Sequence, residues 1–121
     1  MALVTLAACG GGSDTASPRP SDRPTVAGIV DRLEKAEITC INLELVPAGE
    51  RELGAREQGE CEMLRGNLAI RTYNTNTARD SAVKIGQEFG GIYVVGDRWV
   101  VGVDDDATAT RVREALGGEV R

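Results

Sequence analysis

Three cysteines and a complete lack of histidine limit the chemistry that this chain can perform. Without histidine, the sequence lacks the usual general base near neutral pH and the commonest metal ligand. Ser-His-Asp catalysis, Cys-His catalysis and histidine-based zinc sites are therefore excluded. A zinc or iron–sulfur site built from four cysteines also needs more cysteines than the three in this sequence.

The three cysteines divide into a pair and a single residue. Cys9 lies in a glycine-flanked lead-in, whereas Cys40 and Cys61 lie in the patterned part of the chain. A disulfide between Cys40 and Cys61 is the simplest pairing, and it would stabilise so small a domain by roughly 3 kcal/mol. The alternative is two reduced, buried thiols, and export to an oxidising compartment favours the disulfide.

The residues around Cys9 suggest a modification. One branched apolar residue and two small ones precede this cysteine, and small side chains beside a cut suit a peptidase that grips an extended substrate. The stretch LAACG at residues 6–10 resembles the lipobox of bacterial lipoproteins. That resemblance implies a diacylglyceryl thioether on Cys9, cleavage just before it, and attachment to a membrane through the lipid.

Residues 1–8 are interpreted as the remnant of a signal peptide. A secretory signal has a positively charged beginning and an apolar stretch of about 7 to 15 residues. Residues 1–8 supply only the end of such a stretch, with no lysine or arginine before it. We therefore expect the natural reading frame to continue upstream of Met1. If Met1 is the true start, the alternative is a cytosolic domain of unknown role.

Composition divides the rest of the chain into a tether and a domain. Residues 10–24, GGGSDTASPRPSDRP, have no apolar period and are dominated by glycine, serine, proline and aspartate. Such a segment cannot bury enough surface to fold and is typical of a linker. We therefore assign residues 9–24 to the lipidated cysteine and its tether, and residues 25–121 to one domain.

The first part of the domain gives weaker signals than the second. Apolar residues recur at helical spacing after Thr25, which predicts a helix over residues 26–37 with Thr25 as its N-cap. Alternating apolar and polar residues predict a strand over residues 41–45. Residues 47–60, PAGERELGAREQGE, are interpreted as a charged, exposed loop.

The second half contains an internal repeat of a hairpin followed by a helix. Residues 61–74 form two short apolar runs around Gly66 and Asn67, and residues 91–103 form two stronger runs around Gly96 and Asp97. The helix after each hairpin has an apolar face, which comprises Ala78, Ala82, Ile85 and Phe89 in the first and Ala109, Val112 and Leu116 in the second. These units predict an α+β fold with a four-stranded antiparallel sheet, helices packed on one face, and an extra N-terminal helix.

A two-residue turn at Gly96 and Asp97 would place Val94 opposite Trp99. The side chains of Ile92, Val94, Trp99, Val101 and Val103 then share the face that meets the helices. We expect the other face, which carries Val95 and Val100, to be free of helices. Its aromatic and arginine side chains form a candidate partner surface of Arg71, Tyr73, Tyr93 and Arg98. The alternative is an ordinary solvated face with two scattered aromatic residues.

The second half also resembles a known group of proteins. The stretch GGIYVVGDRWVVGVDDDATATRVREAL, residues 90–116, is similar to the C-terminal segment of small, mostly uncharacterised actinobacterial cell-envelope lipoproteins and secreted proteins. The resemblance covers roughly residues 60–118 and the lipobox. It implies an exported α+β domain with a disulfide, and it implies no activity.

Clustered carboxylates raise the questions of metal binding and catalysis. Asp104, Asp105 and Asp106 lack the ligand order of an EF-hand, so helix capping explains them better than calcium binding. We expect no metal and no cofactor. A hydrolase that uses paired carboxylates remains an alternative, and two close, buried carboxylates in a pocket would favour it. A shallow polar surface would favour a binding module.

These observations lead to one functional hypothesis. The net charge of −5, without a basic patch, argues against nucleic-acid binding. We expect a non-catalytic domain that is anchored to the cell membrane on its extracytoplasmic face through a lipid on Cys9. Its partner is expected to be another envelope protein or ligand of unknown identity.

Overall fold

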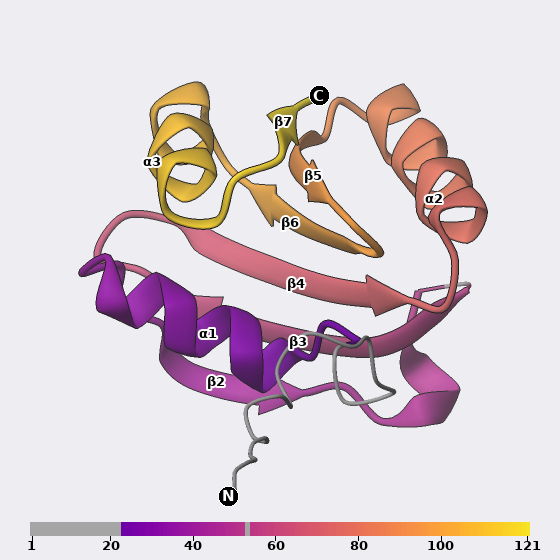
Figure 1. The fold of residues 1–121 in the computed structure, drawn as a ribbon, viewed down its shortest axis with the longest axis horizontal. Helices are drawn as coiled ribbons and strands as arrows, with labels where there is room; N and C mark the ends of the chain where they lie inside the picture. The colour runs from indigo at the N-terminus through magenta and orange to yellow at the C-terminus, as the bar shows by residue number, and fades with distance from the viewer. Residues whose placement is uncertain (1–22, 53) are drawn as a thin grey trace, which may run out of the picture.

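A six-stranded antiparallel sheet is the framework of the domain, and the computed structural model describes residues 23–52 and 54–121. The strands lie in the order β2-β3-β4-β6-β5-β7 (Figure 1). The predicted α+β class is confirmed, whereas the sheet of the described chain has six strands rather than four. The elements are α1 (Val26–Lys35), β2 (Ile41–Leu45), the short 3₁₀ helix η3 (Ala48–Glu50), β3 (Ala55–Glu62), β4 (Asn67–Tyr73), α2 (Asn76–Glu88), β5 (Ile92–Gly96), β6 (Trp99–Val103), α3 (Asp106–Leu116) and β7 (Glu119–Val120).

Strand β3 corrects the prediction of a loop over residues 47–60. It lies between β2 and β4 and pairs with both. At the end of the strand, Glu60 and Glu62 are exposed on one side, while the intervening Cys61 is buried on the other. Burial and pairing on both edges therefore override the low strand propensity of the sequence AREQGECE.

Both hairpin turns lie close to their predicted positions. The β3–β4 turn comprises residues 63–66, in which Met63 donates its backbone N–H to the Gly66 carbonyl and Gly66 has a positive φ of 89°. The β5–β6 turn lies one residue later than predicted, so Val94 pairs with Val101 instead of Trp99. The shift leaves every side chain on its predicted face, because the partner of Val94 moves by two residues.

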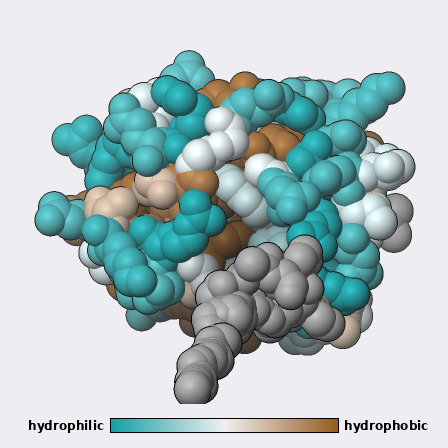
Figure 2. All heavy atoms as spheres, in the orientation of Figure 1, coloured by the Kyte–Doolittle hydropathy of each residue, from teal (hydrophilic) through white to brown (hydrophobic). Residues whose placement is uncertain are grey.

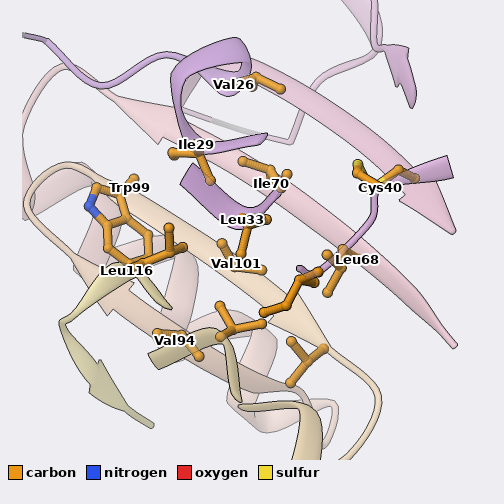
Figure 3. Packing of buried hydrophobic residues seen from close by; sticks show 14 of the residues in the cluster. Val26, Ile29, Leu33, Cys40, Leu68, Ile70, Val94, Trp99, Val101 and Leu116 are labelled. Carbon is orange, nitrogen blue, oxygen red and sulfur yellow. A yellow bond between two sulfur atoms is a disulfide. The ribbon is translucent and has the colours of Figure 1, made fainter. Parts of the chain in front are cut away.

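Helices α1 and α3 cover one face of the sheet and contact each other. Helix α1 begins as predicted, because the Thr25 hydroxyl accepts a hydrogen bond from the Gly28 N–H at 2.9 Å. Figure 3 shows Ile29 and Leu33 pointing from α1 towards the sheet. The buried cluster on this face comprises Val26, Ile29, Leu33, Ile38, Cys40, Cys61, Leu68, Ile70, Val94, Trp99, Val101, Val103, Ala109, Val112 and Leu116.

Helix α2 packs on the opposite face, so the prediction that all helices share one face is wrong. The side chains of Tyr73, Val95 and Val100 form an apolar patch on this second face. Another element must cover this patch to shield it from water. Val83 of α2 is buried against them. The expectation that this second face is free of helices is therefore wrong.

The predicted apolar face of α2 is correct only in its first half. Ala78 and Ala82 pack against the cluster on the second face, but Ile85 is 53% exposed and Phe89 is 86% exposed. Phe89 is the C-cap of the helix and lies beyond its last turn. The apolar face of α3, in contrast, is buried as predicted. Figure 2 shows hydrophilic residues over most of the face in view, with apolar residues in the gaps between them.

A disulfide joins Cys40 and Cys61, which confirms the predicted pairing. The two Cα atoms lie 5.4 Å apart, and both side chains are buried. The disulfide connects the segment between α1 and β2 to β3, the second strand of the sheet. It therefore holds α1 close to the face that it covers.

The disulfide should supply a large share of the stability of the domain. We expect the double variant Cys40→Ser/Cys61→Ser to lose about 3 kcal/mol in free energy of unfolding, because the unfolded chain gains conformational freedom. Urea unfolding measures the loss. Adding a reductant should bring the parent protein close to the variant and leave the variant unchanged. Equal free energies of unfolding for the parent and the double variant, both measured without reductant, would contradict this account.

Two substitutions test the assignment of core and surface. Leu33→Ala should lower the free energy of unfolding by about 2 to 5 kcal/mol, because it opens a cavity between α1 and the sheet. Phe89→Ala should change it by less than about 0.5 kcal/mol, because this large side chain touches little. Urea unfolding of both variants gives the comparison, and a larger loss for Phe89→Ala would show that α2 packs through a different face.

Candidate functional site

Helix α2 leaves part of the second sheet face uncovered. The open part forms a shallow hollow of about 710 Å³ over β2, β3, β4, β6 and the start of β5. Small residues form its floor, because Ala69 of β4 pairs with Gly102 of β6, and Gly102 pairs in turn with Tyr93 of β5. The hollow is therefore a direct consequence of small side chains on central strands.

Four carboxylates lie around the hollow. They belong to Glu44, Glu60, Glu62 and Asp104. Glu44 and Glu60 are directly opposite each other on β2 and β3, an arrangement in which like charges destabilise a sheet. In the part of the chain that the structure describes, neither glutamate forms an ion pair.

Asp104 has a structural role at the rim of the hollow. Its Oδ2 accepts a hydrogen bond from the Asn67 backbone N–H at 2.9 Å, which ties the start of β4 to the segment before α3. The next residue, Asp105, is the N-cap of α3 and accepts from the Thr108 N–H at 2.7 Å. Hydrogen bonds from the backbone and side chain of Thr108 lower the pKa of the Asp105 carboxyl. The capping interpretation of this aspartate is confirmed.

Arg71 separates the hollow from the part of the face under α2. Its neighbours across the sheet are Gln58 of β3 and Val100 of β6. The Arg71 Nε atom is buried, and it has no hydrogen-bond partner within residues 23–52 and 54–121. No ion pair of Arg71 is present in the same residues either. The Arg71 guanidinium, whose Nε–H has no hydrogen-bond partner in the described residues, therefore lines the same hollow as the four carboxylates.

Tyr93 forms the wall of the hollow on the side of α2. A Cβ placed on Gly102 would lie 3.4 Å from the Tyr93 ring, so the ring lies over this glycine. A Cβ on Gly86 of α2 would lie only 1.9 Å from the Tyr93 hydroxyl oxygen. Gly86 is therefore required for α2 to approach the sheet with Tyr93 in this position.

The structure brings together only part of the predicted partner surface. Arg71 and Tyr93 both line the hollow, whereas Tyr73 is 1% exposed beneath α2 and cannot belong to an open surface. Burial raises the pKa of Tyr73, although the nearby charge of Arg71 opposes the rise. Arg98 lies in the β5–β6 turn, where its backbone N–H donates to the Asn76 side chain at 2.8 Å.

The glutamates of the hollow were not predicted as site residues. Their signal was the alternation along β3, in which Gln58, Glu60 and Glu62 follow one another at every second position. A strand places such residues on one face. The interpretation of residues 47–60 as a loop concealed this alternation.

Several sequence predictions concern other parts of the chain. Cys9, the signal remnant at residues 1–8 and the tether up to residue 22 lie outside the described residues. Across residues 23–52 and 54–121, no helix has the length and apolar character needed to cross a membrane. Within the same ranges, no three acidic or cysteine side chains are grouped so that they could hold a metal ion.

Comparisons with known proteins give no relative. No protein-family model, no curated protein and no solved structure matches this chain.

The raised pKa of Tyr73 predicts a loss of stability in alkali. The protonated hydroxyl is favoured in the folded state, so its contribution is complete below the ordinary pKa of 10.0 and is lost as pH rises through the folded value. The variant Tyr73→Phe has no proton to lose at this position. Its free energy of unfolding should therefore fall less between about pH 9 and pH 11 than that of the parent. Urea unfolding across this range measures both slopes, and equal slopes would contradict the prediction.

Proposed function

We propose that this chain is a lipid-anchored protein on the extracytoplasmic face of the cell membrane, and that its domain binds another component of the cell envelope. The buried Cys40–Cys61 disulfide is the observation that carries the proposal. Disulfides persist in oxidising compartments and are rare in the cytosol. The disulfide thus favours export over the alternative of a cytosolic domain that begins at Met1.

The sequence before the domain supplies the proposed anchor. The stretch LAACG at residues 6–10 resembles a lipobox, and its Cys9 would carry the lipid. Residues 10–24 have the composition of a linker, which would connect the lipid on Cys9 to the domain.

The hollow on the second sheet face is the proposed binding surface. It combines an aromatic wall at Tyr93, the spare donors of Arg71 and exposed carboxylates over a floor of small residues. Aromatic and arginine side chains are enriched at protein interfaces. A partner that fills the hollow could bury Tyr93 further and pair with these charges.

Binding accounts for the hollow better than catalysis by carboxylates does. A hydrolase of that kind needs a carboxylic acid in a desolvated site and a second carboxylate beside it. Glu44 and Glu60 are directly opposite each other, but both side chains are exposed in a shallow, open surface. A shallow surface with exposed carboxylates supports a binding module rather than a hydrolase.

Intact mass spectrometry of protein from the native membrane fraction tests the anchor. The expected chain begins at Cys9, carries a diacylglyceryl group, and gains two hydrogens when the Cys40–Cys61 disulfide is reduced. The variant Cys9→Ala should leave the membrane fraction while retaining the disulfide. An unmodified chain with free thiols, recovered from the soluble fraction, would contradict the proposal.

A further inference from the structure

Strand β2 presents an unpaired edge beside the hollow. It is the first strand of the sheet and pairs only with β3 in the described chain. The Val46 N–H donates inward to the Gln58 carbonyl at 2.8 Å. The register shifts between Ile41 and Glu44, where Asn42 has a positive φ of 57°. After this irregularity backbone groups alternate in direction, so the N–H and C=O groups of Glu44 point inward, whereas the C=O of Leu43 and both the N–H and C=O of Leu45 point outward. An open edge of this kind is a template for an additional strand.

One side of this edge is apolar. Leu43 is 38% exposed and Leu45 is 67% exposed, which is high for leucines of a sheet. Both side chains lie over Gly59 of β3, because a Cβ at Gly59 would be 3.2 Å from Leu43 and 3.4 Å from Leu45. Val26 of α1 lies at the same position, so the leucines extend the first buried face towards the edge.

The other side of the edge is acidic. Glu44 points to the second face, where it is opposite Glu60, and Glu62 follows on β3. None of these glutamates forms an ion pair within the part of the chain that the structure describes. A cation placed beyond Glu44 would relieve the repulsion between the opposed carboxylates.

Together these features define the partner. Resting on the proposed binding function, we propose that β2 binds an extended protein segment in which apolar and basic residues alternate, and that this segment adds a seventh strand to the sheet. Its backbone forms hydrogen bonds with the outward C=O of Leu43 and with the outward N–H and C=O of Leu45. Its apolar side chains cover the two leucines, and its basic side chains lie beside Glu44.

Charge disfavours a second copy of this chain as the occupant. A copy of β2 would bring its own Glu44 to the edge and add no lysine or arginine, because its sequence is INLEL. The chain as a whole also carries a net charge of −5, so two copies repel each other. The basic segment therefore belongs to a different protein.

Titration calorimetry of the full chain in a neutral detergent, at low salt, provides the test. The probe is the acetylated, amidated peptide KVKVKVK, with EVEVEVE and the block peptide KKVVVKK as controls. We expect KVKVKVK to bind and EVEVEVE not to bind. KKVVVKK should bind at least about threefold more weakly than KVKVKVK. The variant Glu44→Gln should weaken binding of KVKVKVK by about threefold to tenfold, whereas Glu114→Gln on the outer surface of α3 should not change it.

Two substitutions at one position separate the backbone from the side chain. Leu45→Ala removes the leucine but keeps the outward N–H, whereas Leu45→Pro also removes that N–H at an edge where proline is tolerated. Leu45→Pro should bind KVKVKVK about threefold to tenfold more weakly than Leu45→Ala. Thermal unfolding of both variants, and of Glu44→Gln, shows whether each is folded at the temperature of the titration.

The other outcomes overturn the inference in distinguishable ways. Equal affinities of Leu45→Pro and Leu45→Ala, or of KVKVKVK and KKVVVKK, would exclude strand addition but leave the hollow as a cation-binding surface. If KVKVKVK does not bind, the proposal of a basic partner is excluded. The mass of the native protein would still test the lipid anchor separately. A dimer in sedimentation that Leu45→Pro dissociates would assign the edge to a second copy.

Discussion

The covering of the sheet determines the rest of this structure. A sheet that carries apolar side chains on both faces needs a layer on each side, and the described chain provides three helices for two faces. Helices α1 and α3 together seal the first face around Leu33 and Val101, whereas α2 alone covers only part of the second face. Small residues, Ala69 and Gly102, and the glutamates of β3 occupy the uncovered part, so it needs no further helix to cover it. The open hollow is therefore compatible with a stable fold and available for binding.

The disulfide lies next to the open edge strand β2, because Cys40 directly precedes β2 and Cys61 lies on its partner β3. Cys61 fixes β3 to the segment that follows α1, and β2 is paired with β3 alone on its inner side. The covalent connection therefore stabilises the edge of the sheet that β2 forms. A domain of this size gains much from one such bond, since its core is small. The disulfide can therefore hold β2 in place for a partner, although β2 pairs with β3 alone.

The sequence predicts the second half of this fold better than the first. Val94, Trp99 and Val101 lie on the predicted face because strand alternation depends only on parity, and the caps at Thr25 and Asp105 follow from local hydrogen bonds. Strand β3 escaped prediction because tertiary pairing, rather than its own residues, makes it a strand. Half of the site was predicted, because Arg71 and Tyr93 line the hollow. Tyr73 is buried beneath α2 instead, and the sequence of the preceding hairpin does not determine which face of the sheet α2 covers.

The central claim is that the uncovered part of the second sheet face meets a partner in the envelope. Site-specific photo-crosslinking in cells of the native host tests it most directly, with the photoreactive residue in place of Asn67, an exposed residue that lines the hollow. The matched control carries it in place of Glu114 on α3. The account predicts a discrete adduct from position 67 and none from position 114. An adduct from position 114 alone, or none from either position, would contradict it.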